Sequence, residues 1–213
     1  MSLDDAARIA RAVLYEGYLL YPYRSSSAKN RQRWTFGVIV PPDFSATADR
    51  SRARREVILT AGDIEVLLRF LQLVGNSVVE REVIAPAAGC HPFQFGALKG
   101  ELTIHHQEQR IAVDIENRTR AGQLSTREDA LAFSMLSAHV VLTVRDGSFL
   151  SSLDPAAAGG RNDGLYPVVL DARKGENDST THYWLKIIQS YGGDAPVLDV
   201  TNKAEAHQLE LNE

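Results

Sequence analysis

The sequence predicts an α+β fold, in which an antiparallel β-sandwich or barrel-like core carries an N-terminal helix and a second helix and is followed by a short β-α-β segment. Short runs with strand-like alternation of apolar and polar residues recur between residues 56 and 144. Helical spacing of apolar residues occurs near the N-terminus and again after residue 125. Beyond a glycine-rich break the order becomes strand, helix, strand, which is typical of a parallel sheet.

The first predicted elements are a helix and a strand separated by a polar loop. Apolar residues recur at helical spacing from Leu3 to about Tyr18, with Ser2 as a candidate cap. The helix ends at Tyr21-Pro22, because the residue before a proline is displaced from the α region. Arg33–Val40 then has the pattern of a strand closed by two prolines, and Asp43–Arg55 has the polarity of an exposed connection.

A series of short strands forms the predicted core. Apolar residues occupy every second position from Ile64 to Phe70, which fits a half-buried strand. Ser125–Ser137 interrupts the series with helical spacing, and Ser125 or Thr126 is its candidate cap. The predicted strands are Glu56–Thr60, Ile64–Phe70, Ser77–Ile84, Gly100–His106, Ile111–Glu116 and Val140–Val144.

The clearest break in the chain is Pro155–Gly164, whose small residues, glycines and turn formers are typical of a linker. We therefore predict a mostly-β domain at 1–155, a linker at 156–164 and a separate segment at 165–213. In the last segment Leu165–Asp171 and Pro196–Val200 are predicted strands, and Thr180–Ser190 is a predicted helix.

Composition and charge narrow the class of protein. A net charge of −4 and a pI near 5.9 argue against bulk nucleic-acid binding. The stretch from Arg24 to Arg55, however, contains eight Lys or Arg residues and only two aspartates. This excess of positive charge predicts either a basic face or solvated loops. The single cysteine, Cys90, fits a reducing compartment, and no run approaches the roughly 20 apolar residues of a membrane span. We expect a cytoplasmic protein that does not enter membranes.

The most distinctive stretch is Val13–Pro41, which combines aromatic and basic residues between apolar sequences. Aromatic side chains with a polar tip favour interfaces, and neighbouring arginines can pair with an acidic partner. The same side chains could instead anchor the N-terminal helix on the sheet, and the sequence leaves both open. The candidate interaction residues are Tyr15, Tyr18, Tyr21, Tyr23, Arg24, Arg31, Arg33 and Trp34.

Residues with reactive side chains do not form a recognisable catalytic pattern. Cys90-His91 and His105-His106 are adjacent pairs, and neighbours on a strand point to opposite faces. We therefore expect a structural cysteine and a surface histidine rather than a nucleophile and its base, and no metal site. His139 lies in apolar sequence and is expected to be buried and hydrogen-bonded. No catalytic residue, metal or cofactor is predicted, and we expect a protein that is not an enzyme.

Six motifs carry a resemblance to known proteins over about three quarters of the chain. They are VLYEGYLLYPYR (13–24), K-N-R-x-R-W-x-F-G (29–37), RFLQLV (69–74), PFQFGALKGEL (92–102), ENRT (116–119) and SFLSSLDP (148–155). With them, residues 1–155 resemble an uncharacterised bacterial family associated with gene clusters of actinobacterial-type nickel-iron hydrogenases. The resemblance implies a non-catalytic accessory or interaction protein, with a hydrogenase subunit or maturation factor as its partner.

The last part of the chain resembles a different family. VVLDARKGEN and the following residues to His207 are similar to a fragment of the Roc domain, the Ras-like GTPase module of Roco proteins. The family's guanine-reading N-K-x-D motif matches Asn202, Lys203 and Glu205, with a glutamate in place of the aspartate. No G-x-x-x-x-G-K-[ST] phosphate loop occurs. The resemblance implies, as an alternative function, a guanine-nucleotide-responsive module without hydrolysis.

Overall fold

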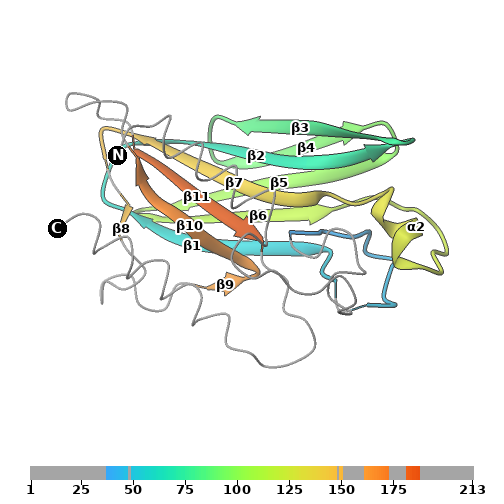
Figure 1. Cartoon of the computed structure of the whole chain (residues 1–213). Coiled ribbons are helices and arrows are strands. Elements are labelled where there is room, and N and C mark those ends of the chain that lie inside the picture. Colours follow the sequence, from blue (N-terminus) through green and yellow to red (C-terminus); the bar gives the residue numbers. More distant parts are fainter. Residues whose placement is uncertain (1–36, 48, 148, 151–160, 173–180, 188–213) are drawn as a thin grey trace, which may run out of the picture.

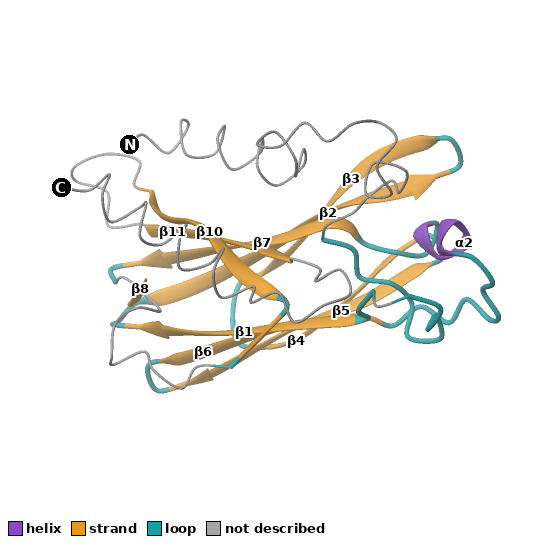
Figure 2. Cartoon of the chain, turned by 60° about the horizontal axis from the view of Figure 1, so that its bottom comes forward, coloured by secondary structure: helices purple, strands orange, loops and turns teal. Residues whose placement is uncertain are grey.

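Alternation of apolar and polar side chains organises the chain into two β-sheets that pack face to face (Figures 1 and 2). The computed structural model describes residues 37–47, 49–147, 149–150, 161–172 and 181–187. Every pairing between its named strands is antiparallel. Among the described residues, no helix is long and apolar enough to cross a membrane.

The first sheet has the order β4-β5-β6-β1-β8, and β9 also pairs with β1. Consecutive hairpins join β4, β5 and β6, so most of this sheet is built from neighbours in sequence. Its strands are β1 (Arg52–Leu59), β4 (Gly89–Phe95), β5 (Leu98–Gln107), β6 (Arg110–Asn117), β8 (Phe149–Leu150) and β9 (Asn162–Asp163).

The second sheet has the order β10-β11-β7-β2-β3. The β2–β3 hairpin forms one side of this sheet, and the β10–β11 hairpin forms the other. The central strand β7 pairs with β2 and β11, which come from distant parts of the sequence. The strands are β2 (Asp63–Val74), β3 (Ser77–Ala85), β7 (Leu136–Arg145), β10 (Leu165–Ala172) and β11 (Thr181–Ile187).

The core lies between the two sheets and is filled by every second side chain of their strands. β2 alternates buried and half-buried residues along its length, and its buried set includes Val66, Leu68 and Phe70. Phe70 meets Phe93 and Phe95 of the opposite sheet at centroid distances of 5.8 and 5.9 Å. Full burial of a side chain such as Phe70 contributes about 1.5–3 kcal/mol, and the partly buried Phe93 and Phe95 add to the contact, so the Phe cluster holds the sheets together beside β3 and β4.

Asn117 and Gly37 hold segments that lie outside the named strands against the β-sandwich. The fully buried Asn117 donates from Nδ2 to the carbonyl oxygens of Ile39 and Phe133 at 3.0 and 2.9 Å, and its Oδ1 accepts from Thr119 N. Gly37 has a φ of 67°, and a Cβ there would lie 2.9 Å from Cα of Ser137. Both residues belong to motifs that carry the family resemblance, and both have a structural role.

The predicted α+β class is wrong, because the described residues form antiparallel sheets and contain one short helix, α2 (Arg127–Leu131). The helix expected at 125–137 is much shorter. Its start is as predicted, since Thr126 caps it by accepting from Asp129 N at 3.1 Å. It ends early because β7 begins at Leu136, where pairing with β2 and β11 replaces helical hydrogen bonds.

The helix predicted at 180–190 is also wrong over its described part, which forms strand β11. Apolar residues at helical spacing there also fit a strand, since β-branched and aromatic residues dominate the sequence THYWLKI. Pairing on both sides, with β10 and β7, decides between the two. The segment is therefore an antiparallel hairpin over 165–187 rather than a β-α-β crossover. The predicted N-terminal helix and the strand at Pro196–Val200 lie outside the described residues.

The arginines before Glu56 belong to a strand, although an exposed connection was predicted there. β1 begins at Arg52, and its register sets Arg52 opposite Glu116 and Arg54 opposite Asp114. The ion pair between Arg54 and Asp114 stabilises this arrangement, which the local sequence does not reveal. The predicted division into domains at 1–155 and 165–213 stays a prediction.

Candidate functional site

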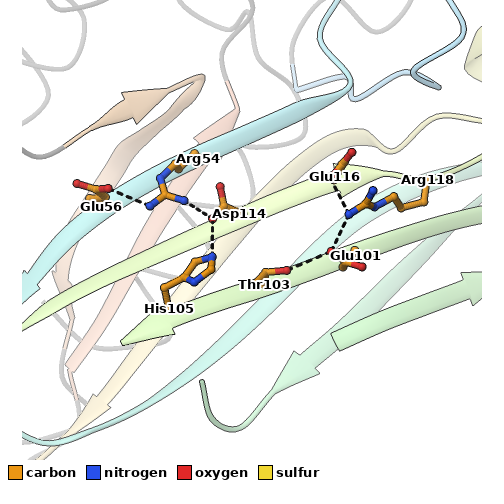
Figure 3. A network of polar contacts seen from close by, with 8 residues as sticks. All are labelled: Arg54, Glu56, Glu101, Thr103, His105, Asp114, Glu116 and Arg118. Atoms are coloured by element: carbon orange, nitrogen blue, oxygen red, sulfur yellow. Dashed lines mark hydrogen bonds and ion pairs between the residues drawn. The ribbon is translucent and has the colours of Figure 1, made fainter. Parts of the chain in front are cut away.

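The outer face of the β4-β5-β6-β1 sheet carries rows of polar residues that run across the strands. In one row, Cys90, Thr103, Asp114 and Arg54 lie opposite one another on β4, β5, β6 and β1. The next row contains Glu101, Glu116 and Arg52. These positions alternate with buried residues, so the pleat itself brings ionisable groups from distant parts of the sequence onto one surface (Figure 3).

Arg54 is the centre of the first network. Its guanidinium donates to the Asp114 carboxylate and, at 3.0 Å, to Glu56 Oε1, while His105 Nε2 lies 3.2 Å from the same Asp114 (Figure 3). Burial alone would lower the pKa of Arg54, but hydrogen bonds to Glu56 and Asp114 raise it overall. The backbone N–H of Arg161 and then the Arg54 guanidinium lower the pKa of Glu56.

Arg118 is the centre of the second network. Its Nη2 lies 3.0 Å from Glu101 and 3.1 Å from Glu116 (Figure 3). This contact with Arg118, followed by hydrogen bonds from Cys90 and Thr103, lowers the pKa of Glu101. In return, the hydrogen bond to the Glu101 carboxylate raises the pKa of the Cys90 thiol.

These two networks are suited to holding a charged surface together. A carboxylate whose pKa is lowered by an arginine is a weak base near neutral pH, and a thiol whose pKa is raised is a weak nucleophile. Within the described ranges, no group of three His, Cys, Asp or Glu side chains is placed to hold a metal ion. The arrangement therefore favours structural and electrostatic roles for the face.

The individual histidines and the cysteine have the following positions. Cys90 is exposed, which contradicts the expectation of a buried structural thiol, because it lies on the outer face of β4. His91 Nε2 lies 2.9 Å from the Ala87 carbonyl oxygen, and His106 Nε2 lies 2.9 Å from that of Glu108. His139 is buried, with Nδ1 2.9 Å from the Ser137 carbonyl oxygen, so the predicted buried and hydrogen-bonded histidine is confirmed.

The β2–β3 hairpin has a different surface. In the described part of the chain, the exposed large hydrophobic side chains are Val74, Val78 and Ile84, and all three belong to this hairpin. Val78 and Ile84 lie towards opposite ends of β3, and Val74 is the last residue of β2. Between Val78 and Ile84 the outward positions hold Glu80 and Glu82.

β3 is also an edge strand. It pairs with β2 over nine residues, from Val66 opposite Ala85 to Val74 opposite Ser77, and with no other described strand. The neighbouring edge strand of the other sheet, β4, contains Pro92, which removes a backbone donor. Natural sheets commonly protect an edge with proline, so the two edges differ in their capacity to accept another strand.

Arg81 holds β3 firmly against the sandwich. Its Nε donates to Gln72 Oε1 at 2.9 Å, and Gln72 Nε2 donates to the Phe95 carbonyl oxygen of β4 at 2.8 Å. The Arg81 guanidinium also lies over the Phe95 ring, 5.0 Å from its centroid. These contacts connect both sheets at this side of the molecule, so the edge of β3 is presented by a supported strand.

The predicted site residues lie outside the described residues. This applies to the interaction residues Tyr15, Tyr18, Tyr21, Tyr23, Arg24, Arg31, Arg33 and Trp34 and to the guanine-motif residues Asn202, Lys203 and Glu205, so both sets remain predictions. The β2–β3 hairpin was not predicted as a site. A signal for it exists in RFLQLVGNSVVEREVI, where apolar residues occupy both faces of the strands on either side of a Gly-Asn turn.

No family model matches the chain, and no curated protein matches it. The fold and the surfaces described above therefore provide the basis for a functional proposal.

Proposed function

We propose that this protein is a non-catalytic interaction module of the cytoplasm that binds a partner protein by strand addition to β3. The observation that carries the proposal is that exposed Val78 and Ile84 lie towards the two ends of β3, an edge strand that pairs with no described strand other than β2. Strand addition uses main-chain hydrogen bonds for affinity and alternate side chains for specificity. The single cysteine supports the cytoplasmic assignment.

The outward side chains of β3 define the chemistry of the partner strand. Glu80 and Glu82 share Arg69, whose Nε lies 3.8 Å from Glu80 and 2.7 Å from Glu82. Both carboxylates lie at exposed positions of β3, so a partner strand that brings positive charge complements them. We therefore expect an extended segment with Lys or Arg at its middle outward positions and apolar residues at the ends, facing Val78 and Ile84.

A second copy of this chain fits the edge less well. Antiparallel pairing of β3 with another β3 about its centre would set Glu80 opposite Glu82 and Arg81 opposite Arg81. Like charges directly opposite each other destabilise a strand pair. We therefore propose a partner protein rather than self-association through this edge. The resemblance of residues 1–155 supports a hydrogenase subunit or maturation factor as that partner, with an accessory or assembly role.

The test uses the full chain and the purified subunits and maturation factors of a nickel-iron hydrogenase from the same host, each measured separately. Val78→Lys and Ile84→Lys should each weaken binding about tenfold or more. Each change removes an apolar contact and introduces a positive charge that repels the positively charged partner strand. Gln94→Lys, an exposed change on edge strand β4, is the matched control and should leave binding unchanged.

Backbone hydrogen exchange tests the mode of binding. Amides of β3 that point away from β2 should exchange rapidly in the free protein and become protected when the partner is bound. Binding that leaves β3 exchange unchanged would contradict strand addition. Absence of binding to every hydrogenase component would contradict the proposed partner class.

A further inference from the structure

A hollow of about 530 Å³ lies between the outer face of β1 and the segment that contains β9. Residues from both sides line it: Arg52, Ala53, Arg54, Asp114, Arg161 and Asp163. The hollow is independent of the β3 edge, because it belongs to the other sheet.

The segment 161–164 is fixed beside β1 by several contacts. Glu56 N donates to the Arg161 carbonyl oxygen at 2.9 Å, and Arg161 N donates to Glu56 Oε2 at 3.0 Å. Arg50 pairs with Asp163, and a Cβ at Gly164 would lie 2.5–2.8 Å from the Arg50 side chain. Glycine at this position therefore leaves the space that Arg50 occupies, and the wall of the hollow is held by named interactions.

The charges around the hollow do not balance. Asp114 is paired with Arg54 and contacts His105, and Asp163 is paired with Arg50. No described carboxylate lies within 4.0 Å of a guanidinium nitrogen of Arg52 or Arg161. Three arginines line the hollow, and one of them, Arg54, is paired with Glu56 as well as with Asp114. Arg52 and Arg161 are therefore the lining arginines that have no described carboxylate partner.

We propose that this hollow binds the dianionic phosphate group of a phosphate monoester. The planar guanidinium groups of Arg52 and Arg161 present paired donors that match the oxygens of such a group. The two positive charges of Arg52 and Arg161 match a dianion, whereas a carboxylate would neutralise only one of them. The volume also leaves room for the organic part of the ligand.

Inorganic phosphate is the first probe, titrated into the full chain at pH 7.5 and low salt and followed by calorimetry or amide chemical shifts. Saturable binding is expected, and Arg52→Gln and Arg161→Gln should each weaken it about tenfold. Arg120→Gln is the control, since Arg120 is an exposed arginine paired with Asp43 and lies outside the hollow. Absence of binding at 10 mM phosphate (roughly 2.7 kcal/mol of affinity), or equal loss in the control, would overturn the proposal.

Charge and source are tested with further probes. Methyl phosphate should bind more weakly as the pH falls from 7.5 to 5, because its second ionisation lies near pH 6 (approximate value). Acetate should bind far more weakly than phosphate at pH 7.5, and equal affinity would overturn the assignment of a dianion. A phosphoserine peptide that binds more tightly than glycerol phosphate would assign the group to a protein side chain, and the reverse order would assign it to a small molecule. Both orders support the site.

Discussion

The outer face of the β4-β5-β6-β1 sheet and the β2–β3 hairpin are both exposed strand surfaces, but their side chains interact in opposite ways. On the first, Arg54 contacts Glu56 on its own strand and Asp114 on β6, and Arg118 contacts Glu116 of β6 and Glu101 of β5, so the charges of these two networks satisfy one another within the chain. On the second, Val78 and Ile84 are exposed on an edge strand whose one described neighbour is β2. The two charged networks therefore contribute to folding, whereas the hairpin is the surface that we propose for a partner.

Removing the connection between the two regions should have the largest effect on stability. Asn117 ends β6 of the charged sheet and bonds Ile39 and Phe133, which lead to the other sheet. Asn117→Ala should lower the free energy of unfolding by roughly 2–4 kcal/mol, since it removes the hydrogen bonds of a fully buried side chain to the Ile39 and Phe133 carbonyl oxygens and to Thr119 N. Denaturant unfolding measures the effect. A loss below about 0.5 kcal/mol, as expected of a surface position, would contradict the structural role of Asn117.

The contribution of the charged face to the free energy of unfolding should depend on pH. The folded-state pKa of Glu56 is lowered by Arg161 N–H and Arg54, so its stabilisation is present above the unfolded-state value of about 4.3 and is lost as the pH falls through the folded-state pKa. Glu56→Gln should therefore cost about 1–2 kcal/mol at pH 7, and the difference from the natural protein should shrink below about pH 4.

Glu108→Gln in the turn after β5 is the control for this pH dependence. Glu108 is exposed, and among the described residues its carboxylate has no ion pair such as the one between Glu56 and Arg54. Denaturant unfolding at pH 7, 5, 4 and 3 gives the comparison. A difference between Glu56→Gln and the natural protein that stays constant down to pH 3 would show that ionisation of Glu56 is not the source of its contribution.

Strands with clear alternation of apolar and polar residues could be predicted from the sequence. Strands that depend on pairing with distant residues could not. Ile64–Phe70 and Ile111–Glu116 lie within β2 and β6, because a period of two specifies a half-buried strand locally. Arg52 and Arg54 were assigned to a connection, since their cross-strand partners Glu116 and Asp114 become visible only through the register. Likewise, β11 is a strand because β7 and β10 pair with it.

The candidate surfaces depend even more on tertiary structure. That β3 lies at an edge follows from strand order, which alternation within β3 does not encode. The meeting of Arg52 with Arg161 requires the chain to return from the second half of the sequence to β1. Sequence patterns identify which face of a strand is buried, but the neighbours of that strand come from the complete topology.

The hairpin itself should show the smallest effect on stability, and this test separates folding from binding most sharply. Ile84→Lys should change the free energy of unfolding by no more than about 0.5 kcal/mol, because Ile84 is 58% exposed. The adjacent Val83 packs against the core, so Val83→Lys should cost at least about 1–3 kcal/mol. Denaturant unfolding of both variants measures the contrast. If Ile84→Lys destabilises the fold as much as Val83→Lys, Ile84 is needed for folding, and loss of partner binding in Ile84→Lys could no longer be assigned to an interface.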